Sequence, residues 1–177
     1  MGHIHSEPGQ HDLTVGAYIV RTDSSEPKVL LHLHRKMVML MPVGGHVELD
    51  ETPWQAVARE LEEESGYSLA DLSILQPTDR LDYLSDVTAH PYPLIMSDQD
   101  VSSDHYHTDI AYAFVANGEP TGKPEENESE DFRWLSLTEL SKLDDDMIFV
   151  NTKEIYTYLL THVLPNWDNV PTGKYKT

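Results

Sequence analysis

The fold is decided by the segment Gly44–Tyr67, which reads GGHVELDETPWQAVARELEEESGY. Within it, Thr52 suits a helix N-cap, Pro53 suits the first helical position, and Gln55 completes a capping box with Thr52. Gly66 suits the C-terminal cap, where the backbone commonly turns left-handed. The segment therefore predicts a helix whose two ends are both marked by the sequence.

The predicted helix, Pro53–Ser65, carries three glutamates on one face. At 100° per residue, Glu63 and Glu64 fall about 60° and about 40° to either side of Glu60. The side chains expected to face the core occupy the arc next to these glutamates, and we therefore expect the carboxylates at the edge of the core. These core side chains are Trp54, Val57, Ala58 and Leu61.

Such a carboxylate cluster is unfavourable unless something binds to it. Like charges at helical spacing repel by roughly a few tenths of a kcal/mol per pair, and the C-terminal end of a helix disfavours anions. A hard divalent cation would turn this repulsion into binding. A solvated acidic helix face is the alternative. The pair Gly44-Gly45 favours the cation, because glycine lets a backbone approach a ligand closely or expose a carbonyl to it.

The same segment resembles a complete Nudix box. Tyr67 stands where an aliphatic residue is usual and Asp50 where many members have glycine, but neither difference removes a carboxylate. A motif with fixed positions spread over 23 residues is far more specific than a short glycine pattern. The matching positions, separated by five, seven, one and one residues, are Gly45, Glu51, Arg59-Glu60-Leu61, Glu63-Glu64 and Gly66-Tyr67.

The resemblance implies an α/β fold, the Nudix-type α/β/α sandwich with a mixed β-sheet. Most Nudix proteins hydrolyse a pyrophosphate bond in nucleoside diphosphates linked to a further moiety, with Mg²⁺ or Mn²⁺ as the cofactor. By motif position, Glu60, Glu63 and Glu64 are expected to bind the metal, and one of them is expected also to act as base. The carbonyl of Gly44 is expected to be a further metal ligand.

Three residues outside the glutamate face also receive roles from the resemblance. Glu51 and Arg59 are expected to support the loop and the helix through an ion pair. Glu128, six residues before Trp134, resembles the position of a distal metal-binding acid in the family's antimutator triphosphatases. Asp109 and Glu130 are alternatives for that acid.

The composition is compatible with this chemistry. The chain of 177 residues contains no cysteine and has a formal net charge of −19, which excludes thiolate metal sites and a cysteine nucleophile. The charge disfavours direct contact with nucleic acid or anionic membranes, whereas phosphates bridged by a cation remain possible. We expect a small-molecule nucleotide as the partner, no nucleic acid or membrane partner, and a cytoplasmic location. A homodimer is one expected state.

The remaining segments predict a mixed sheet covered by helices, because strands and helices follow one another without strict alternation. We expect a single domain over 1–177, with mobile tails at 1–12 and 165–177. A long loop is expected at 85–104 and a second long helix at 151–163. The other expected strands lie at 14–21, 29–35, within 72–84, 106–115 and 132–137, and the glycine-containing segment 41–48 is expected to be a strand or a loop.

Two groups of alternating polar residues lie on predicted strands. His105, His107 and Asp109 share one face of their strand. We expect His107 and Asp109 to contact the substrate, with a second metal site or hydrogen-bonded side chains in a cleft wall as alternatives. His32 and His34 also alternate, and we expect both to be exposed.

Two other functions fit the same fold less well. An isoprenoid diphosphate isomerase depends on a cysteine acid, which this chain lacks. A non-enzymatic nucleotide sensor often loses carboxylates of the box, whereas all are present here. The sequence therefore favours a metal-dependent hydrolase that cleaves a pyrophosphate bond in a nucleoside triphosphate, a nucleotide sugar or a similar compound.

Overall fold

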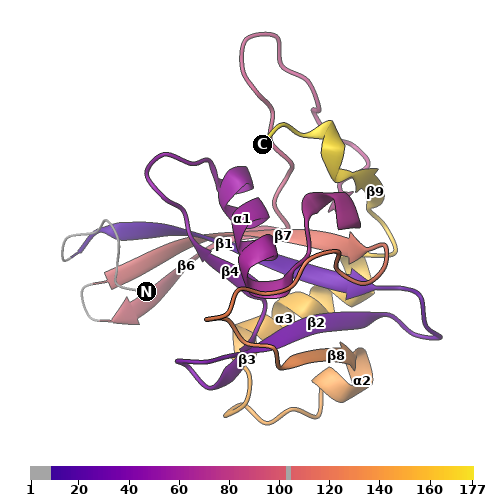
Figure 1. The fold of residues 1–177 in the computed structure, drawn as a ribbon. Helices are drawn as coiled ribbons and strands as arrows, with labels where there is room; N and C mark the ends of the chain where they lie inside the picture. The colour runs from indigo at the N-terminus through magenta and orange to yellow at the C-terminus, as the bar shows by residue number, and fades with distance from the viewer. Residues whose placement is uncertain (1–8, 103–104) are drawn as a thin grey trace.

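The computed structural model describes residues 9–102 and 105–177. Its strands form one mixed sheet with the order β3-β2-β1-β7-β5-β9, and β4 pairs with β1, β6 with β7 and β8 with β2 (Figure 1). The strands are β1 (His11–Arg21), β2 (Lys28–His34), β3 (Met39–Met41), β4 (Val43–His46), β5 (Leu72–Gln76), β6 (Ile95–Ser102), β7 (His105–Ala116), β8 (Phe132–Ser136) and β9 (Asp168–Pro171).

The centre of the sheet is a parallel pair made by β1 and β7, two strands far apart in the sequence. Their register pairs Asp12 with His107 and Thr14 with Asp109. Strand β4 pairs with β1 from the other side and antiparallel, which brings His46 opposite Thr14. The starts of β1 and β7 therefore lie beside the end of β4.

One face of the sheet is covered by α1 (Pro53–Ser65), whose ends lie where the sequence predicts them. The Thr52 side chain accepts a hydrogen bond from the Gln55 backbone N–H, and Gly66 has a left-handed φ of 73°. Ala56 is fully buried, while Ala58, expected in the core, is only half-buried. The core on this side includes Trp54, Val57 and Leu61 of α1 and Val15, Ala17 and Ile19 of β1.

The opposite face is covered by α3 (Val150–Tyr158), which continues as a π-helical turn over Leu159–Val163. The predicted helix at 151–163 is therefore present. A second core forms between Tyr156, Leu159 and Val163 on this side and Tyr18 and Val20 of β1. Helices thus cover both faces of a mixed sheet (Figure 1), which confirms the predicted α/β/α sandwich.

Short helical turns complete the connections between these elements. They are α2 (Leu137–Leu140) and the 3₁₀ turns Leu69–Asp71 and Thr172–Lys174. No helix in the described parts of the chain is both long and apolar enough to span a membrane.

The C-terminal segment differs from the expectation of a mobile tail at 165–177. Strand β9 pairs antiparallel with β5, and Tyr175 is buried with its ring centroid 6.0 Å from that of Trp54. This segment therefore packs against the core beside α1. At the other end, residues 1–8 of the predicted 1–12 tail lie outside the described residues, and β1 already begins at His11.

The long loop also differs from its prediction in position. It spans residues 77–94 and projects at the top of Figure 1, while part of the predicted loop at 85–104 forms β6, an exposed strand paired with β7. Arg80 holds the loop to the C-terminal segment through an Nη1–Oδ2 contact of 2.7 Å with Asp168. Strand β6 could not be predicted from the sequence pattern, because a strand exposed to solvent needs no alternation of apolar and polar residues.

Candidate active site

Two of the three glutamates on α1 approach the glycine-containing strand β4, and the third lies at the rim. Glu60 is 1% exposed and Glu64 is 5% exposed, whereas the Glu63 side chain is 33% exposed at the rim. Glu64 accepts a hydrogen bond of 2.9 Å from the Gly44 backbone N–H. The prediction that the three residues share a face beside the core agrees with this geometry, although Glu60 and Glu64 are buried more deeply than an edge position requires.

The close approach between β4 and the helix explains the two glycines. A Cβ on Gly45 would lie 2.2 Å from Oε1 of Glu60. A Cβ on Gly44, where φ is 158°, would lie 2.2 Å from the backbone oxygen of Val15. Gly45 therefore leaves room for a carboxylate, and Gly44 leaves room for the neighbouring strand.

Arg59 joins the glutamates to the loop before the helix. Its guanidinium makes two hydrogen bonds to Glu51, of 2.7 and 3.2 Å, so the structure contains the expected Glu51–Arg59 ion pair. Nη1 of Arg59 also contacts Glu60 at 2.8 Å and Glu63 at 3.0 Å. Nη2 donates to the carbonyl of His46 at 2.9 Å. One side chain thus fixes strand β4, the loop and two glutamates relative to one another.

His32 lies beside Glu64, and the prediction that it is exposed is wrong. The residue is 1% exposed, and its Nε2 lies 3.6 Å from Oε2 of Glu64. Strand β2 is buried because it pairs with β1, β3 and β8 and has a helix-covered core on each side. Alternation alone could not show this, since a strand buried on both faces needs no polar face.

Burial sets the protonation of this group in the metal-free protein. Burial, together with the charges of Glu60, Glu128 and Glu63, raises the pKa of Glu64 to about 8, although the hydrogen bond from Gly44 acts in the opposite direction. Burial also raises the pKa of Glu60, despite Arg59. Burial lowers the pKa of His32 to about 4. A neutral imidazole therefore faces a carboxyl group that is protonated near pH 7.

Glu128 belongs to a loop that docks on the C-terminal end of α1. The backbone N–H of Glu125 donates to the carbonyl of Glu63 at 2.8 Å, and that of Gly122 donates to the carbonyl of Gly66 at 3.0 Å. Glu128 itself is half-buried, and its charge raises the pKa of both Glu60 and Glu64. The loop thus brings a fourth acid into the electrostatic field of the helix glutamates.

His107 and Asp109 lie elsewhere. Asp109 accepts a hydrogen bond of 2.8 Å from the Thr14 hydroxyl, and a Cβ placed on Gly16 would contact both Asp109 and Tyr18. Tyr18 belongs to the core beside α3, so these side chains are on the sheet face opposite α1. The structure does not bring the predicted substrate-binding pair together with the glutamates.

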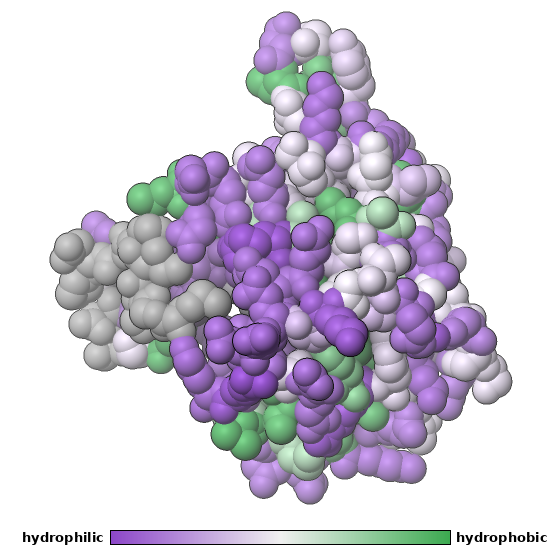
Figure 2. Space-filling model, viewed as in Figure 1, coloured by the Kyte–Doolittle hydropathy of each residue, from purple (hydrophilic) through white to green (hydrophobic). Residues whose placement is uncertain are grey.

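The donors beside α1 suit an oxygen-preferring cation. Oε2 of Glu60 is buried without a hydrogen-bond partner, and Glu63 and Glu64 offer further carboxylate oxygens beside the single imidazole of His32. Mg²⁺ prefers such ligands and keeps several waters, which suits a site with Glu63 at its solvent-facing rim. Figure 2 shows hydrophilic residues gathered over the centre of the face that α1 covers.

Comparison with known proteins agrees with this architecture. A model of the NUDIX domain matches residues 10–158. A NUDIX-family hydrolase from Clostridium perfringens is 29% identical with a TM-score of 0.66, and the match covers 85% of this chain and 97% of that one. A comparison with curated proteins gives no match.

More distant structures share the fold. The Caenorhabditis elegans Ap4A hydrolase is 17% identical with a TM-score of 0.60, over 84% of this chain and 95% of that one. The NUDIX domain of Shewanella oneidensis NrtR, complexed with ADP ribose, is 16% identical with a TM-score of 0.61, over 86% and 90%. The family match and the shared architecture show that the chain belongs to the Nudix family and is a Nudix hydrolase, an enzyme acting on phosphorus-containing acid anhydrides.

Proposed function

We propose that the protein uses Mg²⁺ or Mn²⁺ to hydrolyse a pyrophosphate bond in a nucleoside diphosphate linked to another moiety. The observation that carries this proposal is the burial of Glu60 and Glu64 against β4, with Glu63 at the rim. Buried carboxylates are costly unless they are paired or bind a cation. Arg59 contacts only one oxygen of Glu60, so the cluster retains oxygens to offer to a metal.

Each residue would have a distinct task. Glu60, Glu63 and Glu64 would hold the cation, and the Gly44 carbonyl and Glu128 are the proposed further ligands. When bound, the cation would supply charge neutralisation on the phosphate oxygens and activation of the attacking water. Arg59 would keep the carboxylates oriented, because it already contacts two of them.

The similar structures support a nucleotide-like substrate. Besides the Ap4A hydrolase and the domain bound to ADP ribose, they include the Escherichia coli dihydroneopterin triphosphate pyrophosphohydrolase, 16% identical with a TM-score of 0.59. The compounds in these descriptions all contain phosphoanhydride bonds. Substrate contact by His107 and Asp109 stays a prediction, and their position on the other face of the sheet does not support it.

A substrate panel with a matched variant tests the proposal. The full chain is incubated with Mg²⁺ and nucleoside triphosphates, nucleotide sugars, dinucleoside polyphosphates or ADP-ribose, and the products are separated by chromatography. We expect cleavage at a pyrophosphate bond that chelator abolishes and Mg²⁺ restores. Glu64→Gln should lose this activity, whereas Glu62→Gln, at an exposed neighbouring position on α1, should keep it.

Two results would contradict the proposal. If the protein bound a nucleotide of the panel but cleaved none of the compounds, it would be a nucleotide sensor. Equal turnover by the Glu62→Gln and Glu64→Gln variants would assign the glutamates to a solvated acidic surface.

A further inference from the structure

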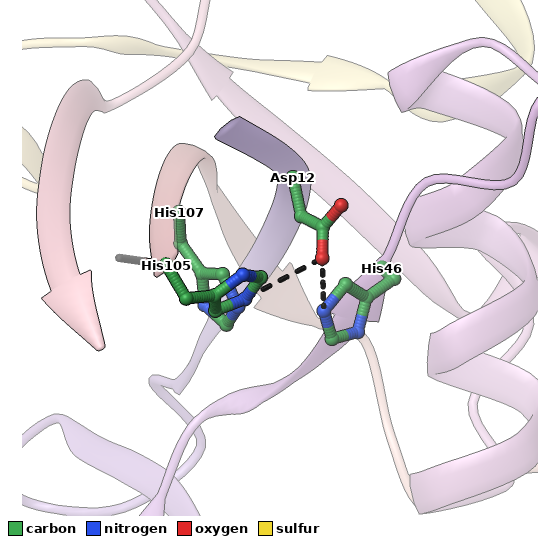
Figure 3. Close-up of side chains that lie close together, drawn as sticks. All are labelled: Asp12, His46, His105 and His107. Atoms are coloured by element: carbon green, nitrogen blue, oxygen red, sulfur yellow. Dashed lines mark ion pairs between the residues drawn. The ribbon is translucent and has the colours of Figure 1, made fainter. Parts of the chain in front are cut away.

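A second group of metal-ligating side chains lies on the sheet face opposite α1. It consists of Asp12 of β1, His46 at the end of β4, and His105 and His107 at the start of β7 (Figure 3). We name these four residues the histidine cluster. One ligand atom from each of them lies within 4.8 Å of the other three.

Sheet geometry holds these residues together. Asp12 pairs with His107 in the parallel register of β1 and β7, and His46 pairs with Thr14, two residues after Asp12. Alternate residues of a strand point to the same face, so all four side chains emerge on one side. Asp12 and His105 are buried, and the other two residues are half-buried.

The spacing suits ligands of a common ion. Oδ2 of Asp12 lies 3.4 Å from Nε2 of His105 and 3.7 Å from Nε2 of His46 (dashed lines in Figure 3). Both distances exceed the range of about 2.7–3.2 Å for a direct hydrogen bond. Ligand atoms at about 2.05 Å from a tetrahedral Zn²⁺ are separated by about 3.3 Å, which is close to the two observed distances.

The three rings of the cluster contact one another through His107. His107 packs edge-on against His46 and against His105, with both centroid separations at 5.0 Å and interplanar angles of 87° and 85°. A metal ion binds imidazole through a nitrogen without a proton, so three neutral rings and one carboxylate can share a single ion.

The donor set selects a class of metal different from that expected at α1. Imidazole nitrogen favours Zn²⁺ and the later first-row transition metals, whereas carboxylate and water favour Mg²⁺. Four protein ligands also leave no open position, which is typical of a structural zinc site. His11 does not belong to the cluster, because its ring stacks on Tyr106 and hydrogen-bonds to Thr108.

We propose that the histidine cluster is a structural site for Zn²⁺ or a related transition metal, with Asp12, His46, His105 and His107 as its ligands. The ion cross-links β1, β4 and β7 at one end of the sheet. This assignment is independent of the proposed hydrolysis at α1, since Gly45 and His46 face opposite sides of β4.

Zinc binding to the full chain tests the site. Titration calorimetry is performed with Zn²⁺ in an excess of Mg²⁺, which occupies sites made of oxygen donors alone, and thermal unfolding is followed in parallel. We expect one equivalent of Zn²⁺ to bind and to raise the melting temperature. His105→Asn and His107→Asn should each weaken Zn²⁺ binding by at least tenfold and abolish the melting shift.

Matched variants separate this site from other histidines and from α1. His11→Asn is one control, because His11 is the sequence neighbour of Asp12 but its own ring hydrogen-bonds to Thr108. The double variant His3→Asn/His5→Asn is a second control, which removes the two histidines near the first residue. Both, and Glu64→Gln, should bind Zn²⁺ like the unaltered chain. With Co²⁺, the unaltered chain should give the strong visible absorption of a four-coordinate site.

Four results would overturn the proposal. One is the absence of Zn²⁺ binding by the unaltered chain, and another is undiminished binding by His105→Asn. The third is a loss of binding that occurs only in the control variants. Weak absorption typical of six-coordinate Co²⁺ would also contradict a site with four protein ligands.

Discussion

Two neighbouring residues of β4 belong to two different chemical environments. Gly45 faces α1, where Glu60 leaves no room for a side chain, and His46 faces the histidine cluster. The first environment offers several carboxylate oxygens, an arginine and the single imidazole of His32, and the second offers three imidazoles and one carboxylate. The alternation of a single strand can therefore keep two sites with different metal preferences apart.

The largest expected effect is a loss of turnover when a glutamate of α1 is changed but not when a histidine of the cluster is changed. Glu63→Gln and Glu64→Gln should each lower turnover by a factor on the order of a hundred or more, because each removes a proposed ligand that stabilises charge in the transition state. His105→Asn should leave Mg²⁺-dependent turnover within about twofold. Steady-state kinetics at saturating Mg²⁺ measures both effects, and similar losses in all three variants would show that the two sites act together.

Arg59 tests whether the glutamates need an organising partner. Arg59→Lys keeps the charge but cannot reproduce the two hydrogen bonds to Glu51 together with the contacts to Glu60, Glu63 and the His46 carbonyl. We expect turnover to fall by about 10- to 100-fold, the range typical when partners of metal ligands are changed. The proposed role of Arg59 in orienting the glutamates would be contradicted if Arg59→Lys left turnover unchanged and also left unchanged the Mg²⁺ concentration needed for the half-maximal rate.

The two glycines sharpen the comparison within β4. Gly45→Ala should displace the flexible Glu60 carboxylate and lower turnover about tenfold or more, with a small change in the free energy of unfolding. Gly44→Ala should instead clash with the backbone oxygen of Val15 and destabilise the fold by about 1–3 kcal/mol. Urea unfolding and kinetics on both variants measure these effects, and the reverse pattern would contradict the assignment.

Glu128 should have a smaller effect than the helix glutamates. We expect Glu128→Gln to lower turnover several-fold and to change the dependence of rate on Mg²⁺ concentration, because its charge acts on Glu60 and Glu64. Glu126→Gln is the control, since Glu126 is exposed in the same loop. Equal effects of the two substitutions would indicate an acidic loop with no specific role.

The smallest predicted effect is a pH dependence of stability in the metal-free protein. Because the pKa of Glu64 is raised to about 8 from 4.5, its stabilising contribution is present at low pH and is lost as pH rises towards 8. The lowered pKa of His32 acts in the opposite direction between about 4 and 6.5. The Glu64 effect should therefore be clearest between pH 6.5 and 8, with a slope of at most about 1.4 kcal/mol per pH unit.

Glu64→Gln should flatten the dependence of the unfolding free energy on pH. In the unaltered chain, Mg²⁺ should bind more tightly as pH rises over the same window, because its binding displaces the proton of Glu64. Denaturant unfolding at several pH values in chelator measures the slope. A Glu64→Gln variant with the same slope as the unaltered chain would contradict the assignment of the titrating group. If His105→Asn and the unaltered chain show the same dependence of unfolding free energy on pH, the titrating group lies on the α1 side of the sheet.

Local sequence preferences were enough to predict helix α1 and the acidic face that it carries. Thr52, Pro53 and Gly66 mark helix ends through local backbone and side-chain preferences, which act over a few residues. The spacing of Glu60, Glu63 and Glu64 places them on one face because helical periodicity is fixed by backbone geometry. These features were therefore predictable without knowledge of any distant contact.

The residues that lie next to these glutamates, and those of the histidine cluster, could not be predicted in the same way, because they come from distant segments. His32 meets Glu64 because β2 lies inside the sheet, and Asp12 lies beside His107 because β1 and β7 pair in parallel although these two residues are 95 positions apart in the sequence. Strand pairing, register and the burial of a strand on both faces depend on contacts between remote segments. A local pattern does not encode those contacts, so the histidine cluster emerges only when the three strands come together.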